Sequence, residues 1–298
     1  EGRDGPAMRT LLPLLALAGV APAQGLDVAV EGVEVAEVVR LVERYAGVRA
    51  EVDESVARRK ITLQLARARA ETALRCAAFA AEAVARRGPD GIWHVEEISK
   101  RSWLRDALET LRKKRLDAGE PRETPLADLL ARLRGATGLN VVLDPRAGLR
   151  ESAVVLSGER SAFEHLVALS AGDGPAWDLR WETLFVSTEA RLAELRLSAE
   201  AAPEAEPGPK EKESARRLEE RRLDLPEEAS PLSALLDLIA RAIEREIAVD
   251  PRAMLAVGQL DLAAPARSIA ARSALDLLCT TSGLAYALRG DGVIIRTP

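Results

Sequence analysis

The chain has 298 residues, with 42 Lys and Arg against 47 Asp and Glu, a net charge of -5 and 47% hydrophobic residues. This composition excludes a wholly disordered chain, and the acidic balance argues against a nucleic-acid-binding protein, which normally carries a basic face. Two cysteines and two histidines also provide too few soft ligands for a structural zinc site.

The N-terminal segment has the three parts of a secretory signal peptide. A short positive start at Met8 and Arg9 precedes an apolar run at residues 11–20, and Ala-Pro-Ala at 21–23 supplies the small residues of a cleavage site. The apolar run is too short to span a bilayer as a helix. We therefore predict a cleavable signal peptide over residues 1–23 and a periplasmic or otherwise exported mature chain with no transmembrane segment.

The rest of the chain contains an internal repeat. The sequence Asp-Pro-Arg-Ala occurs at residues 144–147 and again at 250–253, and the apolar positions around it match at the same spacing. A more diverged copy places Asp53 at the corresponding position. Self-similarity of this kind indicates a repeated structural unit. We predict three tandem modules, at residues 26–97, 115–190 and 221–298.

Each module opens with a short strand, predicted at residues 26–30 in the first copy, and continues with an amphipathic helix. In the second copy Thr124 is predicted at the N-cap and Pro125 at N1, and Ser-Pro at 230–231 repeats the pattern. Glycine suits the C′ position at Gly47 and at the equivalent residue of the second copy, whereas Glu244 stands there in the third.

After this helix the apolar residues alternate, as at residues 48–52, which predicts a half-buried strand that ends at the Asp-containing turn. A second strand, a second helix and a final strand or hairpin complete the module. The predicted fold class is therefore α+β, with three tandem modules of order β-α-β-β-α-β(β). In each module two helices pack on small sheets around a thin aliphatic core.

Two connectors differ in character. Residues 98–114 are predicted to form a charged helix with Trp103, Ala107, Leu108 and Leu111 on one face, which would pack on its neighbours. Residues 191–220 contain three prolines and alternating Glu and Lys with no apolar period. This second connector is predicted to be a flexible, solvated linker that tethers the third module loosely.

The copies resemble the secretin and TonB short N-terminal domain, a small exported module found ahead of secretin channels and TonB-dependent receptors. The resemblance rests on the following residues: an opening Leu-Asp, the apolar pattern of the first helix, strand ends at Val52-Asp53, Leu143-Asp144 and Val249-Asp250, the strand Ile61-Thr62-Leu63-Gln64-Leu65, and residues 274–278 with 282–286. It implies a two-helix module on small sheets that is used for protein–protein contact in the bacterial envelope. No secretin pore, receptor plug or barrel sequence accompanies it, so gating, secretion and iron uptake are not implied for this chain acting alone.

No catalytic constellation is found in the sequence, and we predict no enzyme activity, cofactor or metal. His94 lies on an alternating strand and His165 in an apolar helix, where structural roles are expected. The Asp-Pro-Arg-Ala segments are interpreted as turns in which Asp accepts backbone N–H bonds, with a repeated ligand pocket as the alternative. Cys76 and Cys279 lie on apolar helical faces and are predicted to be buried free thiols.

The leading functional hypothesis is an exported, non-enzymatic protein that binds other envelope proteins, as an accessory or adaptor of a secretin-type secretion or pilus assembly. The alternative is a periplasmic module that binds a small molecule or cell-wall glycan. Its candidate ligand surface is formed by Trp93, Trp103, Trp177 and Trp181, whose competing interpretation is core filling and hairpin packing. A hydrolase is a third, weaker possibility. The sequence leaves the partner's identity and the oligomeric state open.

Overall fold

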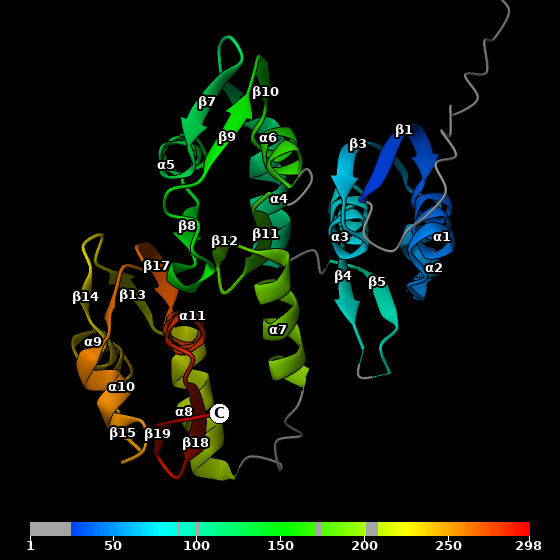
Figure 1. Ribbon diagram of the computed structural model, residues 1–298. Helices are drawn as coiled ribbons and strands as arrows, with labels where there is room; N and C mark the ends of the chain where they lie inside the picture. The colour runs from blue at the N-terminus through cyan, green and yellow to red at the C-terminus, as the bar shows by residue number, and fades with distance from the viewer. Residues whose placement is uncertain (1–24, 89, 99–101, 171–173, 201–207) are drawn as a thin grey trace, which may run out of the picture.

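The computed structural model describes residues 25–88, 90–98, 102–170, 174–200 and 208–298. The strands form several small sheets, and the helices pack against them (Figure 1). The predicted α+β class is confirmed. The predicted signal peptide, residues 1–23, lies outside the described residues. Over the part of the chain that is described, no helix combines the length and apolar character needed to cross a membrane.

We describe the elements in three units. The N-terminal unit contains β1 (Leu26–Glu34), α1 (Val35–Ala46), β2 (Ala50–Val52), α2 (Glu54–Ala57), β3 (Lys60–Ala68), α3 (Ala70–Ala80), β4 (Ala83–Arg87) and β5 (Trp93–Glu97). The middle unit contains α4 (Trp103–Lys113), β6 (Arg115–Asp117), β7 (Arg122–Pro125), α5 (Leu126–Thr137), β8 (Asn140–Leu143), η1 (Pro145–Ala147), β9 (Ala153–Leu156), β10 (Glu159–Ser161), α6 (Ala162–Leu169), β11 (Ala176–Arg180) and β12 (Thr183–Ser187).

Helix α7 (Glu189–Glu200) follows the middle unit. The C-terminal unit contains α8 (Pro209–Glu220), β13 (Arg222–Leu225), β14 (Ser230–Pro231), α9 (Leu232–Ile243), β15 (Ile247–Val249), α10 (Met254–Gln259), β16 (Asp261–Leu262), β17 (Ala266–Ala270), α11 (Ala271–Ser282), β18 (Ala285–Arg289) and β19 (Gly292–Arg296).

One strand arrangement recurs in the three-stranded sheet of each unit. The strand orders are β2-β5-β4, β8-β12-β11 and β15-β19-β18. In each sheet the first strand runs parallel to the central one, and the hairpin partner runs antiparallel to it. In each unit the opening strands pair antiparallel with the strands that precede α3, α6 or α11, as β1 does with β3.

Helices α1, α5 and α9, which occupy corresponding places in the three units, each bury an apolar stripe because their hydrophobic residues recur at helical spacing. In α1 this stripe is Val35, Val38, Val39 and Val42, and α5 and α9 bury leucine and isoleucine at the same spacing. All three helices end on a residue in the left-handed region, which is glycine in α1 and α5. In α9 that residue is Glu244, with φ 56.

Glu244 occupies a conformation that favours glycine, since its Cβ crowds the backbone there. Its carboxylate accepts hydrogen bonds from the guanidinium groups of Arg217 at 2.9 Å and Arg221 at 3.3 Å, both in or next to α8. These ion pairs hold the left-handed cap in place where the sequence lacks the glycine signal.

The predicted helix start in the second and third copies is wrong by one residue. Pro125 and Pro231 occupy the N-cap itself, with ψ values of 136 and 133, and no side chain caps either helix. The physical reason is that the carbonyl oxygen of the residue just before the partner strand accepts from the first helical N–H. Leu126 donates to Ser152 at 2.8 Å, and Leu232 donates to Leu260 at 2.8 Å. A Thr or Ser hydroxyl is therefore not needed at this position.

The prediction of a flexible linker at residues 191–220 is also wrong for most of its length, because α7 and α8 occupy residues 189–200 and 209–220. Helix α8 packs on α11 and buries Ser214 and Leu218. Glu, Lys, Arg and Ala are strong helix formers, and the helix is held in place by the packing of Leu218 and by the ion pair of Arg217 with Glu244. The C-terminal unit is thus held by a packed helix.

A separate core was expected in each of the three modules. The described residues instead form two hydrophobic clusters. The first runs without a break through the N-terminal and middle units. The second joins Val142, Ala176 and Phe185 on the outer face of the middle sheet to Leu192 and Leu195 of α7 and to the C-terminal unit. Neighbouring units therefore share cores.

Candidate protein-binding interfaces

The four tryptophans proposed as a ligand surface do not form one. Trp93 in β5 and Trp177 in β11 are only 2% and 3% exposed. Trp103 begins α4 and is half-buried against the first cluster. Trp181 lies in the β11–β12 turn, where its ring meets Phe185 edge-on at 5.4 Å and Arg180 stacks over it. Their positions fit core filling and hairpin packing.

The histidines and cysteines likewise have structural surroundings. His165 is buried, and its Nε2 lies 2.9 Å from the carbonyl oxygen of Leu116. His94 is partly exposed, with Nδ1 3.6 Å from the Glu51 carboxylate on the neighbouring strand. Cys76 and Cys279 are both buried and free, as predicted. Burial raises the pKa of each thiol to about 12.

The Asp-containing turns bear out the turn interpretation. Asp53, Asp144 and Asp250 each accept a hydrogen bond from the backbone N–H two residues later, at 2.8, 3.0 and 2.8 Å. Within the described part of the chain, no three His, Cys, Asp or Glu side chains lie grouped as a metal site requires.

A pocket of about 390 Å³ lies between the end of α3 and α4. Its charged groups are engaged with one another. Glu82 receives hydrogen bonds from Arg105 at 3.3 Å and from Arg112 at 3.0 Å. Arg112 also donates to the carbonyl oxygens of Phe79 and Ala80, and so provides hydrogen-bond donors for the C-terminal end of α3. The pocket walls are thus an ion-paired contact between the N-terminal and middle units.

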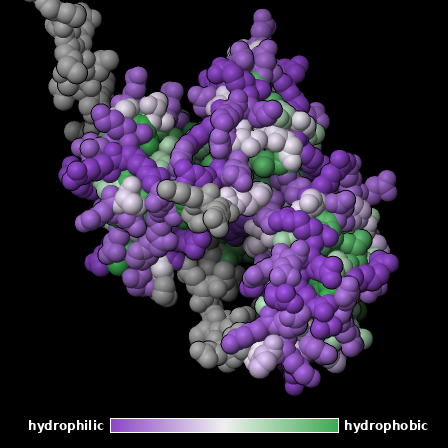
Figure 2. All heavy atoms as spheres, turned by 180° about the vertical axis from the view of Figure 1, so that it is seen from behind, coloured by the Kyte–Doolittle hydropathy of each residue, from purple (hydrophilic) through white to green (hydrophobic). Residues whose placement is uncertain are grey.

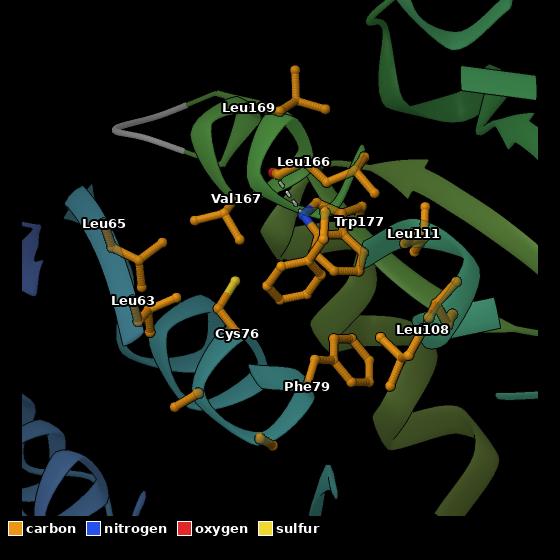
Figure 3. Packing of buried hydrophobic residues seen from close by; sticks show 14 of the residues in the cluster. Leu63, Leu65, Cys76, Phe79, Leu108, Leu111, Leu166, Val167, Leu169 and Trp177 are labelled. Carbon is orange, nitrogen blue, oxygen red and sulfur yellow. Dashed lines mark hydrogen bonds between the residues drawn. The ribbon is translucent and has the colours of Figure 1, made fainter. Parts of the chain in front are cut away.

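The centre of this contact is aromatic (Figure 3). Phe79 of α3 stacks on Trp177 of β11 with ring centroids 5.4 Å apart, and Phe163 of α6 meets the same indole edge-on at 6.0 Å. The indole Nε1 donates to the Leu166 carbonyl at 2.8 Å, which satisfies the polar atom of a buried ring. Aliphatic side chains of β3, α4 and α6 surround this centre.

A buried ion pair lies beside the aromatic centre. The guanidinium of Arg75 in α3 pairs with the carboxylate of Glu189 at the start of α7, and their side chains are 4% and 7% exposed. Arg75 also donates to the Trp177 carbonyl at 2.8 Å, and Thr72 donates to Glu189 at 2.8 Å. Such a pair is stable only because each charge is compensated by further hydrogen bonds.

The middle and C-terminal units meet through a strand edge. The side-chain amide of Asn140 accepts from the N–H of Arg267 at 2.8 Å and donates to its carbonyl oxygen at 3.1 Å. The Glu182 carboxylate accepts from the N–H of Ala270 at 3.0 Å and binds the guanidinium of Arg222 in a bidentate manner. Two side chains of the middle unit therefore bind backbone groups on the outer edge of β17.

A polar network links the same two units. The carboxylate of Asp144, which is 1% exposed, accepts from Ser187 Oγ at 2.8 Å and lies 3.5 Å from Arg191 Nε in α7. Arg191 in turn donates to the carbonyl of Thr280 in α11 at 3.1 Å. The turn aspartate of the middle unit has thereby acquired a second role, in docking the C-terminal unit.

The outer faces of the three sheets differ at corresponding positions. Across the middle sheet, neighbouring strands place Val142, Phe185 and Asp178 in one row, and Val142 and Phe185 are buried under α7 and the C-terminal unit. The corresponding row of the N-terminal sheet is Glu51, His94 and Arg86. The corresponding row of the C-terminal sheet is Ala248, Ile294 and Ala287, all half-exposed.

Sequence reasoning missed the groups that join the units, namely Arg75, Glu189, Asn140 and Glu182. Arg75 carries the only available signal, because it is a charged residue between Leu74 and Cys76 on an apolar helix. Comparison with models of known protein families, with curated proteins and with solved structures found no significant match to this chain.

Proposed function

We propose that this chain is an exported, non-enzymatic protein that binds other proteins of the bacterial envelope, as an accessory or adaptor of a secretin-type assembly. The localisation and the kind of assembly rest on the signal-like N-terminal sequence and on the resemblance to secretin and TonB short N-terminal domains. The binding role rests on the contacts between units.

The observation that carries the binding role is the recognition of β17 by Asn140 and Glu182. Side chains of the middle unit bind backbone groups at a strand edge of the C-terminal unit, and strand edges are a surface at which proteins commonly bind extended partners. The chain thus already uses its fold for unit-to-unit recognition.

The partner surface that we infer is the outer face of the C-terminal sheet. On the middle sheet the corresponding face is covered in part by α7, whose Leu192 and Leu195 join the cluster of Phe185. The C-terminal sheet presents Ala248, Ile294 and Ala287 at these positions. Figure 2 shows hydrophobic atoms (green) at the surface of the C-terminal unit among mainly hydrophilic ones. The partner suited to this face is a protein helix with two apolar residues one turn apart.

The test is chemical cross-linking of the tagged full chain in living cells, followed by purification and mass spectrometry. We expect the same envelope protein to be recovered in repeated experiments. The substitution Ile294→Lys should lower its recovery by about tenfold or more, because a lysine would have to be desolvated in the contact.

His94→Lys is the matched control, since it changes the equivalent position of the charged N-terminal sheet and should leave recovery unchanged. Failure to recover any envelope protein would overturn the proposed function. Undiminished recovery with Ile294→Lys would refute the choice of this face and leave the binding role standing.

A further inference from the structure

Strand β9 has one unpaired edge. It belongs to a two-stranded sheet whose other member is β7, and no described residue hydrogen-bonds to its outer side. In Figure 1 this sheet lies at the top of the middle unit, away from the C-terminal unit. An edge of this kind is a template for pairing with another strand.

The direction of the free hydrogen-bonding groups follows from the register. Leu126 donates to Ser152 one position beyond the Pro125–Ala153 end of the ladder, so this opposed pair is a hydrogen-bonded one. Opposed pairs in an antiparallel ladder alternate between hydrogen-bonded and non-hydrogen-bonded. The pairs Pro125 with Ala153 and Glu123 with Val155 are therefore non-hydrogen-bonded. Ala153 and Val155 direct their N–H and C=O groups to the free edge, and the missing N–H of Pro125 agrees with this assignment.

The edge is also apolar. The sequence of β9 is Ala-Val-Val-Leu, and Val155 is 69% exposed. Strands elsewhere in the molecule carry charges that discourage pairing, such as Arg86 and Arg87 in β4. No such charge lies within β9.

We propose that β9 pairs antiparallel with β9 of a second copy of this chain, which goes beyond the proposed function and does not depend on it. The register that uses both outward residues pairs Ala153 of one protomer with Val155 of its partner, and the reverse, about a two-fold axis at Val154. Each such pair exchanges two hydrogen bonds. The result is a four-stranded sheet, β7-β9-β9-β7, of the symmetric kind commonest in homodimers.

Charge supports a second copy as the occupant. In the antiparallel register Ser152 of one strand lies opposite Leu156 of the other, and the segment from Ser152 to Leu156 contains no charged residue. Two copies therefore place no like charges opposite one another across the two-fold axis. The outward residues are also self-complementary, because Ala153 and Val155 of one copy meet Val155 and Ala153 of the other.

The first test is sedimentation equilibrium of the purified full chain. We expect a reversible dimer, and we expect Val155→Pro to weaken dimerisation by about tenfold or more, because each protomer loses an outward N–H. This substitution removes no bond to β7, so the fold is retained, as circular dichroism would check. Val155→Lys should have the same effect by placing a charge on the edge. Leu255→Lys, at an equally exposed position on α10, should not.

The second test is oxidation of Val154→Cys. At the two-fold axis the Cα atoms of this non-hydrogen-bonded pair would lie about 4.5 Å apart, within the range that a disulfide spans. We expect a covalent dimer, whereas Leu255→Cys should give none. The native thiols do not interfere, because both are buried. A monomer at all concentrations, or a dimer unaffected by both Val155 variants and not trapped by Val154→Cys, would overturn the proposal.

Discussion

Asp144 and Asp250 occupy corresponding turns, but Asp144 makes more contacts than Asp250. Asp250 is half-buried, and its carboxylate caps the N–H of Arg252. Asp144 makes the same bond to Arg146 and in addition accepts from Ser187 within reach of Arg191, while almost fully buried. The turn role could be predicted from the Asp-Pro pair. The second role could not, because Ser187 and Arg191 are distant in sequence.

We therefore expect Asp144→Ala to lower the free energy of unfolding by about 2–4 kcal/mol, because it leaves the buried Ser187 hydroxyl without its acceptor and removes the carboxylate that lies beside Arg191. Asp250→Ala, the matched control, should lose about 1 kcal/mol, as expected for a single turn bond. Urea unfolding followed by circular dichroism measures both values. Equal losses would show that the Ser187 and Arg191 contacts contribute nothing.

The buried pair of Arg75 and Glu189 leads to a sharper expectation. Arg75→Ala should destabilise the protein by about 3–5 kcal/mol, because the Glu189 charge then remains buried without its partner. Arg115→Ala, which breaks the exposed pair with Glu159, should change stability by less than about 1 kcal/mol. Chemical denaturation compares the two variants, and similar small effects would mean that water replaces the lost guanidinium.

The thiols of Cys76 and Cys279 titrate in the folded protein only at high pH, since burial raises the pKa of each to about 12. In the native protein at pH 8 we expect almost no reaction with a thiol reagent, and full reaction in urea. Because the folded pKa is the raised one, stability is fully present below the unfolded pKa, which is near 8.5, and falls as the pH rises towards 12. Rapid labelling of the native protein at pH 8 would contradict this.

At the scale of elements, helices with a clear apolar stripe could be predicted from sequence, and so could the strand ends at the Asp turns. Helix α4 was expected and is found, with Ala107, Leu108 and Leu111 buried. Helix α8 was missed because it buries only two residues, and its strength comes from helix propensity and from α11, which lies far along the chain.

The packed state of α8 is testable through Leu218, which is 1% exposed. Leu218→Ala should lower the free energy of unfolding by about 2–4 kcal/mol through the cavity it creates. Glu220→Ala, on the exposed side of the same helix, should have an effect within about 0.5 kcal/mol. If residues 209–220 were a solvated tether, both variants would unfold like the parent chain in a denaturant titration.

At the scale of the molecule, the sequence repeat predicts three tandem copies but not how the copies meet. The meeting surfaces depend on residues that differ between copies, such as Phe185 in the middle sheet and His94 at the same register in the N-terminal sheet. A repeat records what the copies share, so the differences that build the interfaces cannot be predicted from it.

The core shared by the N-terminal and middle units predicts that the two units unfold together. Phe79→Ala should destabilise the protein by about 3–5 kcal/mol and should raise amide hydrogen exchange in α1 and in β12 together. Leu255→Ala, at an exposed position, should raise neither. Faster exchange confined to the N-terminal unit would show that the two units unfold independently.

Trp177 meets its surroundings in three separate ways: its ring stacks on Phe79, its indole N–H is bound to Leu166, and its carbonyl is bound to Arg75. Separation of the N-terminal and middle units would therefore expose the indole ring to water and change its fluorescence emission. The molecule carries an intrinsic optical reporter at its main internal contact, so events at that contact can be followed in the unlabelled protein.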